Sequence, residues 1–474
     1  MDLDAFARHA HATVDRIVEY WARLEERPVR AQVAPGDVDA QLQTAAPEQP
    51  DDVAEILADF ERIVLPGMTH WQHPRFFAYF PANASPPSVL AEMLTAGVAA
   101  QCMLWQTSPA ATEMETRVLD WVRQAIGLPA GFSGVIQDSA SSATLAAMVA
   151  ARERALAGTG NAAGLSTGPA VTVYATAEAH SSIEKACRIA GIGSAGLRLV
   201  ATDEAGGMRA DALRGRIAAD RAAGYRPAAV IATLGSTGVG AVDPVADIAA
   251  VTRAEALYLH VDAAWAGSAL LLDEWRWLID GVESADSFVF NPHKWLGVQF
   301  DCAAHFVREP AVLTAALGIR PSYLTSAETG AVIDYRDWSI PLGRRFRALK
   351  LWFTLRAYGL EALRAMLRDH IAWTDELATW IDAEPDFELT TPPSLALLTF
   401  RHLPDGVAEV DSHNRALLER VNADGFLYLT PHVHHGRAVL RWSIGARTTE
   451  RRHVVEAFER VKMLARCWTV SASR

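Results

Sequence analysis

The sequence has few cysteines and no long apolar run. Its four cysteines, Cys102, Cys187, Cys302 and Cys467, stand far apart without a C-x-x-C pair, which excludes a dense disulfide framework. No segment reaches the roughly 18 apolar residues that a membrane-spanning helix needs. The start, MDLDAFARHAHATVDRI, carries acids where a secretory signal has Lys or Arg. We therefore expect a protein of the cytoplasm that does not enter a membrane.

Positive charge is also scarce. The 474 residues include 44 Lys and Arg against 56 Asp and Glu, which gives a net charge of −12. Because binding to a phosphate backbone needs a concentrated positive field, nucleic acid is not an expected partner. Half of the residues are hydrophobic and only 21% are charged, which excludes a disordered chain and indicates a large buried core.

The N-terminal part contains two amphipathic helices without a core of their own. Apolar residues recur at helical spacing over 6–25, and a second helical pattern over 51–67 follows a linker rich in Pro and Gly. Each helix has an apolar stripe that needs a surface to cover. We expect residues 1–85 to form an extension that packs on another body, the partner subunit of a dimer.

The central part alternates short apolar runs with helical stretches. The runs lie at 171–176, 197–202, 228–235, 256–263 and 287–291. Such alternation predicts an α/β domain over 86–360 with a mainly parallel sheet, whose ligands lie beyond the carboxyl ends of the strands. A helical stretch over 343–382, strands at 395–403 and 438–445 and a last helix predict a small α+β domain over 361–474.

Several residues able to do chemistry follow the predicted strands. Asp262 ends one buried strand, where a carboxylate is costly without a cation or donor. Lys294 ends the next strand and can act as a Schiff-base nucleophile. His180 lies at a strand end and offers a ring that can titrate or stack. Each feature alone has an ordinary structural explanation, so their joint occurrence at one edge of the sheet carries the argument.

A phosphate seat is predicted where Ser139, Ala140 and Ser141 precede a long helix. Unpaired N–H groups at a helix start, together with hydroxyls, favour anion binding. An amine, a carboxylate that can hold a pyridinium proton, a stacking ring and a phosphate seat are the groups that pyridoxal 5'-phosphate requires.

The chain resembles the pyridoxal-phosphate-dependent group II decarboxylases, and within them the aromatic-L-amino-acid decarboxylases. Eight collinear blocks carry the resemblance over nearly the whole length, among them GVIQDSASSATL (134–145), LHVDAAWAGSA (259–269) and FNPHKWLGVQFDC (290–302). The resemblance implies fold type I, the aspartate-aminotransferase-like fold with a seven-stranded sheet, and a homodimer with shared active sites. It also implies decarboxylation to an arylalkylamine through an external aldimine and a quinonoid.

The resemblance assigns roles to particular residues. Lys294 is the Schiff-base lysine, Asp262 pairs with the pyridine nitrogen, His180 stacks on the ring, and Tyr323 donates the proton to Cα from a mobile loop. The implied coenzyme-binding residues are Ala140, Ser141, His180, Thr237, Asp262, Ala264, Asn291, His293 and Lys294. The implied substrate-binding residues are Trp71, Tyr79, Phe80, Pro81, Ala82, Met103, Trp105 and Gly343, with those near Trp105 entering from the partner subunit.

The expected substrate is an aromatic L-amino acid, because an apolar, aromatic-walled pocket disfavours the charged tail of glutamate. Ala82, Met103 and Ser142 depart from the family pattern, so tryptophan, DOPA, tyrosine and phenylalanine all stay open. Gly343 argues against histidine. The family also contains enzymes that oxidatively deaminate to an aldehyde, often with Phe at the loop tyrosine or Asn at the stacking histidine; Tyr323 and His180 favour decarboxylation.

Two hypotheses from other classes are less well supported. A non-catalytic binding protein is disfavoured because Lys294, Asp262 and Tyr323 are all present. A metal hydrolase built on His432, His434 and His435 lacks a neighbouring carboxylate or Cys in the sequence. A metal is therefore not expected.

Overall fold

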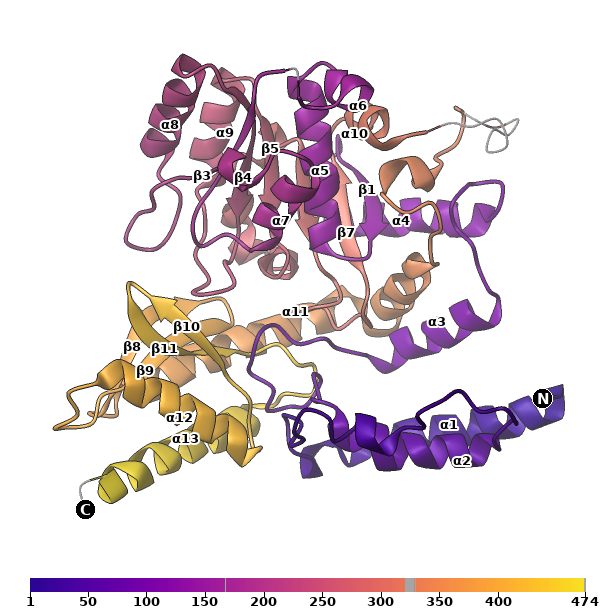
Figure 1. The fold of residues 1–474 in the computed structure, drawn as a ribbon, viewed down its shortest axis with the longest axis vertical. Coiled ribbons are helices and arrows are strands. Elements are labelled where there is room, and N and C mark those ends of the chain that lie inside the picture. Colours follow the sequence, from indigo (N-terminus) through magenta and orange to yellow (C-terminus); the bar gives the residue numbers. More distant parts are fainter. Residues whose placement is uncertain (167, 320–327, 329, 473–474) are drawn as a thin grey trace. The chain divides into compact units, whose positions relative to one another are not determined.

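The computed structural model describes residues 1–166, 168–319, 328 and 330–472, with side chains as far as residue 467 (Figure 1). The chain divides into two compact units. The first consists of Met1–Pro81, Trp373–Pro392 and Thr399–Arg474, and the second of Ala82–Ala372 and Pro393–Leu398. None of the helices in the described ranges combines the length and apolar composition needed to cross a bilayer.

A seven-stranded sheet forms the centre of the second unit. Its strands lie in the order β1-β7-β6-β5-β4-β2-β3. The pairs from β6 through β5, β4 and β2 to β3 are parallel, whereas β7 is antiparallel to both neighbours. The strands are β1 (Ser133–Gln137), β2 (Val171–Ala175), β3 (Leu197–Leu199), β4 (Arg226–Thr233), β5 (Tyr258–Asp262), β6 (Ser287–Phe290) and β7 (Ala303–Val307). The mainly parallel sheet expected from the sequence is confirmed.

The helices of the second unit cover this sheet. One hydrophobic cluster joins α5, α7 and α10 to the face of the sheet that carries Val173, Ile231 and Tyr258, while α8 and α9 contact β4 (Figure 1). The helix bounds are α3 (Pro86–Gly97), α4 (Pro109–Ala125), α5 (Ala140–Ala155), α6 (Thr159–Ala163), α7 (Ser182–Ile189), α8 (Ala210–Ala222), α9 (Val245–Ala254) and α10 (Pro310–Leu317).

Helix α5 owes its place to small side chains. Most of its buried positions are Ala, including Ala146, Ala147, Ala150 and Ala151, so its backbone can approach the sheet closely. Ser139 caps the helix by accepting a hydrogen bond from the backbone N–H of Ser142 at 3.2 Å. The helix therefore starts directly after β1, at the carboxyl ends of the parallel strands.

The first unit contains the terminal helices and most of a four-stranded sheet, in the order β10-β11-β9-β8. Its elements are α1 (Leu3–Ala22), α2 (Val53–Asp59), β8 (Phe387–Ser394), β9 (Leu397–His402), α12 (Val410–Asp424), β10 (Thr430–His434), β11 (Arg437–Ser443) and α13 (Arg451–Ala472). Helix α11 (Arg347–Asp382) begins after the expected residue 343, and Gly359 bends it with a φ of 70°.

The N-terminal helices bury little within the described chain. Helix α1 has no buried residue, and its apolar side chains Leu3, Phe6 and Val18 are 84%, 60% and 56% exposed. The apolar stripe expected from the sequence thus exists. The described residues of this chain do not provide a surface that covers this stripe.

Candidate active site

Asp262 is the last residue of β5 and is buried, with 4% of its surface exposed. Its Oδ1 accepts a hydrogen bond from the backbone N–H of Ala264 at 3.0 Å. The next strand, β6, lies beside it, with Asp262 opposite Val289. Because one carboxylate oxygen has a local donor and the group is out of water, Asp262 is held rigidly at the carboxyl end of the sheet.

Lys294 lies in the turn that follows β6. Its backbone N–H donates to the carbonyl of Asn291 at 2.9 Å, and its own carbonyl accepts from the side chain of Asn83 at 2.8 Å. The next residue, Trp295, is fully buried, stacks on Trp265 at 5.1 Å and donates its indole N–H to His370 at 2.9 Å. The backbone that carries the amine is therefore fixed on both sides.

His180 lies close enough to both groups for electrostatic interaction. Its pKa is lowered, first by desolvation; Asp262 acts to raise it and Lys294 to lower it. Its Nδ1 accepts a hydrogen bond from the backbone N–H of Ser182 at 3.1 Å, which leaves the ring proton on Nε2 in the neutral form. The structure thus places His180 within electrostatic reach of both Asp262 and Lys294.

The start of α5 reaches the same place. Ala140 and Ala143 pack against Val289 of β6, with Ala264 alongside them. The backbone N–H of Asn291 donates to the carbonyl of Ala264 at 2.9 Å. The phosphate seat expected at Ala140 and Ser141 therefore adjoins the residues that follow β5 and β6.

The residues present fit pyridoxal 5'-phosphate. The side-chain oxygen of Asn291 is buried, and among the described residues it has no hydrogen-bond partner, a costly arrangement unless a bound polar group donates to it. His293 is buried with a pKa lowered to about 3, chiefly by desolvation and then by Lys294. Its Nδ1 accepts from the backbone N–H of Cys302 at 2.9 Å. Thr237 lies in the turn after β4.

The residues expected at the substrate divide between the two units. Trp71, Tyr79, Phe80 and Pro81 lie in the first unit, where the rings of Trp71 and Tyr79 stack at 5.4 Å. The guanidinium of Arg441 lies 4.7 Å from the centre of the Phe80 ring and donates to the carbonyl of Tyr79. These contacts give the first unit a partly exposed aromatic surface.

The remaining expected residues belong to the second unit. Gly343 is exposed, and a Cβ there would lie 3.1 Å from the side-chain nitrogen of Gln101. Ala82 and Met103 are partly buried. Tyr323 lies outside the described residues.

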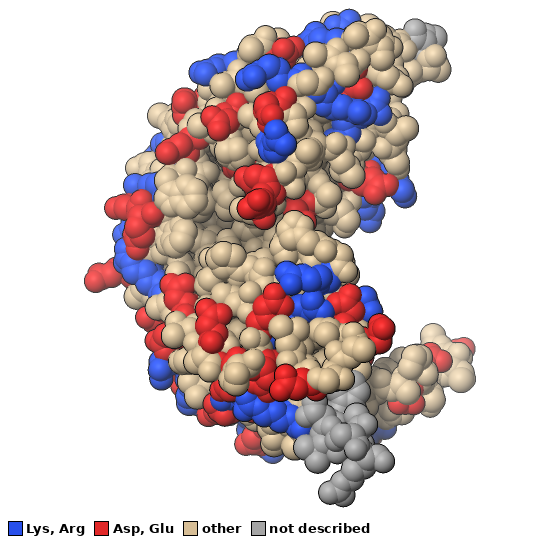
Figure 2. Space-filling model, turned by 90° about the vertical axis from the view of Figure 1, so that its left-hand side faces the viewer, with Lys and Arg blue, Asp and Glu red and all other residues tan. Residues whose placement is uncertain are grey.

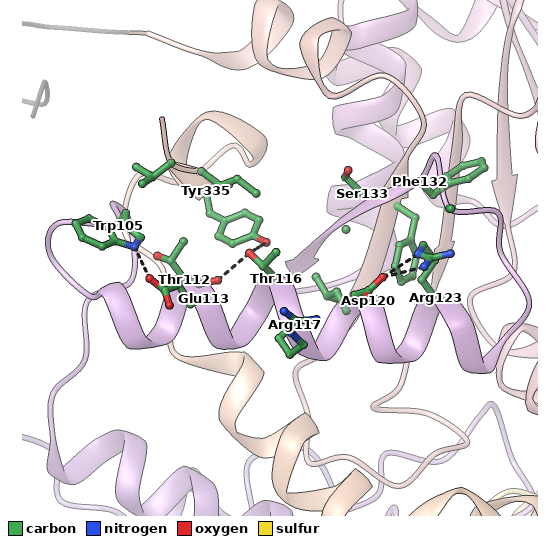
Figure 3. Close-up of a pocket in the computed structure, with 16 residues that line it drawn as sticks. Trp105, Thr112, Glu113, Thr116, Arg117, Asp120, Arg123, Phe132, Ser133 and Tyr335 are labelled. Carbon is green, nitrogen blue, oxygen red and sulfur yellow. Dashed lines mark hydrogen bonds and ion pairs between the residues drawn. The ribbon is translucent and has the colours of Figure 1, made fainter. Parts of the chain in front are cut away.

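A cavity of about 690 Å³ lies between α4, β1 and residues 332–335. Figure 3 shows Trp105 at one end of it, donating its indole N–H to Glu113 at 3.0 Å, and Tyr335 bonded to Thr116 at 2.9 Å. The cavity is lined by none of the residues expected to bind the coenzyme.

The three histidines of the metal-hydrolase hypothesis lie in or beside strand β10. His432 and His434 belong to the strand, and His435 follows it with a backbone φ of 47°. On the face that Figure 2 shows, Lys and Arg side chains are interspersed with Asp and Glu, which is typical of a solvated surface.

The sequence did not identify three groups that support this site. Asn83 holds the Lys294 carbonyl, His370 holds Trp295, and His260 joins β5 to Ser287 and Thr144. Their partners are 211, 75, 27 and 116 residues away in the chain, so no local pattern could have indicated them.

Comparison with known proteins gives matches over nearly the whole chain. A family model described as the pyridoxal-dependent decarboxylase conserved domain matches residues 35–403. A phenylacetaldehyde synthase of Arabidopsis thaliana is 41% identical over 471 residues, covering 97% of this chain and 95% of the relative. An aromatic-L-amino-acid decarboxylase of Mus musculus is 40% identical over 479 residues, covering 98% of each.

Solved structures agree with these matches. The crystal structure of Oryza sativa TDC with PLP and tryptamine has a TM-score of 0.95 at 36% identity, covering 98% of both chains. That of Rhodiola rosea 4-hydroxyphenylacetaldehyde synthase has a TM-score of 0.92 at 34% identity, covering 98% of this chain and 99% of that one.

Proposed function

The chain belongs to the pyridoxal-dependent decarboxylase family, and from this premise we propose that it decarboxylates an aromatic L-amino acid to the corresponding arylalkylamine and CO₂. The observation that carries the proposal is that Asp262 ends β5 and Lys294 follows the neighbouring strand β6 beside the start of α5, with His180 within electrostatic reach of both. These groups lie at the carboxyl ends of parallel strands, where ligands of such sheets bind.

Pyridoxal 5'-phosphate is the coenzyme. Bound here, it supplies an aldehyde that joins the substrate amine and a protonated ring that accepts electrons from Cα as CO₂ leaves. Asp262 would hold the proton on the ring nitrogen, and Lys294 would hold the coenzyme covalently. The residues proposed to bind the rest of it are Ala140, Ser141, His180, Thr237, Ala264, Asn291 and His293.

The chain's own residues set the orientation of the reacting bond. Rigid support of Asp262 and of the Lys294 backbone would limit the movement of a substrate bound beside them, and orientation of this kind lowers barriers substantially. We propose that Tyr323 returns the proton to Cα, which yields the amine.

The aromatic substrate class rests on the relatives and on the aromatic surface of the first unit. Trp71, Tyr79 and Phe80 present rings in contact with one another or with a buried cation. Relatives named for tyrosine and tryptophan decarboxylation are 39% and 38% identical to this chain. An apolar wall of this kind discriminates against substrates with a charged side chain.

Oxidative deamination to an aromatic aldehyde is the second candidate. It is favoured by the 41% identity to a phenylacetaldehyde synthase and by the fold shared with the Rhodiola rosea enzyme. His180 and Tyr323, the residues often replaced in such enzymes, are both present here, which supports decarboxylation to the amine.

We further propose a homodimer in the cytoplasm. The exposed apolar side chains of α1 support packing of residues 1–85 on the partner subunit, with 86–360 as the coenzyme-binding domain and 361–474 as the small domain. The contribution of Trp105 to the partner's site is supported by its place in a cavity whose lining includes none of the residues expected to bind the coenzyme. All four cysteines are thiols outside any disulfide, which suits a reducing compartment.

The test is a product assay on the purified protein with tryptophan, DOPA, tyrosine and phenylalanine. Amine and CO₂ in equal amounts support the proposal, whereas aldehyde with stoichiometric ammonia and hydrogen peroxide supports the second candidate. Lys294→Ala should lose the visible absorbance of lysine-bound coenzyme that borohydride removes from the parent. Lys185→Ala, at an exposed position of α7, is the matched control and should keep both absorbance and activity.

A further inference from the structure

His260 is a fully buried histidine with a hydrogen-bond partner at each ring nitrogen. It lies on β5, two residues before Asp262, and is 1% exposed. Its Nδ1 is 2.7 Å from the hydroxyl of Ser287 on β6. Its Nε2 is 3.2 Å from the hydroxyl of Thr144 on α5. One side chain therefore joins the three elements that carry Asp262, Lys294 and the start of α5.

The hydrogen bond between His260 and Thr144 lies below the two ends of the proposed coenzyme site. Residues two apart on a strand share a face and are about 6.6 Å apart along it, so His260 lies directly below Asp262. Thr144 lies four residues, about 6 Å, below Ala140 on α5. Four residues thus mark the corners of an arrangement that we call the anchor frame, with Asp262 and Ala140 at the top and His260 and Thr144 at the bottom. Its lower side is the hydrogen bond between His260 and Thr144.

The upper side of the anchor frame has no direct bond between its corners that could fix its length. This upper side is the distance between Asp262, proposed to bind the ring nitrogen of the coenzyme, and Ala140 at the start of α5, proposed to bind its phosphate. Apolar contacts of Ala140 with Val289 and Ala264 resist compression of this span, but they have no directional preference. The directional contact is the one that His260 makes from below.

The ring makes these bonds in its neutral form. Burial lowers the pKa of His260 to about 3, and the nearby His305 lowers it further. A neutral imidazole has one N–H donor and one acceptor nitrogen, which matches two hydroxyl partners that can each donate or accept. Both edges of the ring are therefore satisfied without an ionic partner.

We propose that His260 is a positioning residue that sets the spacing between the two anchors of the coenzyme through its hydrogen bond to Thr144. The inference rests on the proposed function, since it needs pyridoxal 5'-phosphate as the ligand. It assigns no contact between His260 and the reacting atoms.

The decisive measurement is the dissociation constant of pyridoxal 5'-phosphate, followed by absorbance on adding it back to the coenzyme-free protein. Thr144→Val keeps the shape of the side chain and removes the hydroxyl, whereas Thr144→Ser keeps the hydroxyl. Because the bond is already present without the coenzyme, its loss weakens binding only by the cost of restoring the spacing, which is up to roughly tenfold in the dissociation constant. We expect this loss in Thr144→Val and in His260→Leu, and a value within about twofold of the parent in Thr144→Ser.

His305→Leu controls for the loss of a buried imidazole as such. His305 is fully buried, and the centre of its ring lies 6.1 Å from the centre of the His260 ring. Neither of its ring nitrogens has a hydrogen-bond partner in the part of the chain that the structure describes. Its variant should keep the parent's affinity for the coenzyme. Thermal unfolding of each coenzyme-free variant distinguishes a general loss of stability from an effect on the coenzyme site. A purely structural effect would lower the melting temperature without weakening coenzyme binding.

The inference is overturned if Thr144→Val binds the coenzyme as tightly as the parent, or if Thr144→Ser loses as much affinity as Thr144→Val. Should His260→Leu not fold, the two Thr144 variants still decide the question. Failure of the proposed function is distinguishable, because the parent protein itself would then not bind pyridoxal 5'-phosphate.

Discussion

Acidification should unfold this protein steeply, because five buried imidazoles have pKa values far below the ordinary one. Desolvation is the largest cause at each, and the pKa is lowered to about 4 at His70 and to about 3 at His73, His260, His293 and His305. In the unfolded chain each returns to about 6.5. Unfolding therefore takes up protons between these values, and stability is lost as the pH falls from 6.5 toward 4.

The size of the effect follows from proton counting. At pH 5 an unfolded imidazole is almost fully charged and a buried one almost neutral, so the five together give a slope of about 7 kcal/mol per pH unit and a loss of about 9 kcal/mol between pH 7 and 5. Asp243 opposes them, because burial raises its pKa to about 6. Its stabilisation is full below the ordinary pKa and is lost as the pH rises through 6, so acidification restores about 1 kcal/mol.

The net loss of about 8 kcal/mol is comparable with the whole stability of an ordinary domain, about 5–15 kcal/mol. We expect urea unfolding, followed by circular dichroism on the coenzyme-free protein at pH 7, 6 and 5, to show this loss and complete unfolding between pH 5 and 4. His305→Leu removes one of the five groups and should reduce the slope by about a fifth. A change of less than about 2 kcal/mol between pH 7 and 5 would refute the assignment of neutral, buried imidazoles.

Four substitutions test other parts of the chain. Asp262→Ala should lower amine formation by orders of magnitude, because it removes the carboxylate proposed to hold the proton on the coenzyme ring; a near-normal rate contradicts that role. Tyr323→Phe should keep coenzyme binding and shift the product toward aldehyde, and an unchanged amine yield counts against its role as proton donor. Gly267→Ala places a Cβ 2.3 Å from the Cβ of Phe290 and should cost about 1–3 kcal/mol in urea unfolding. Gly215→Ala, with nothing within 4 Å on α8, should instead stabilise slightly, by up to about 1 kcal/mol.

The sequence predicted the parallel strands of the large sheet better than the antiparallel strand β7 and the edge strands of the small sheet. Strands β2, β4, β5 and β6 run through the middle of the large sheet and are apolar on both faces, so their composition alone marks them. Strand β7 contains His305, and its antiparallel direction leaves no mark in composition. Strand β10 contains Pro431, and β8 contains Pro392 and Pro393 near its end. Both are edge strands of the small sheet, where Pro is tolerated and burial is partial.

The site was predictable where chemistry and local position coincide. Asp262 ends β5, and Lys294 and His180 lie four and five residues after β6 and β2. The rule that ligands bind at the carboxyl ends of parallel strands predicts from the sequence alone that they lie at one edge of the sheet. The supporting residues escaped because their roles depend on contacts between distant segments. Nothing in the run LYLHVDA distinguishes His260 from a filler of the core until Thr144 of α5 is seen beside it.

A leucine at position 260 would fill a similar volume and avoid the cost of removing polar nitrogens from water. Apolar contacts tolerate sliding, however, and cores repacked with other apolar groups lose uniqueness of structure before they lose stability. A ring bonded on two edges allows one orientation only, and a fully satisfied polar network rigidifies its surroundings. Because orbital alignment at Cα tolerates little misplacement, a directional contact below Asp262 serves the reaction in a way that a stronger but less specific apolar contact does not.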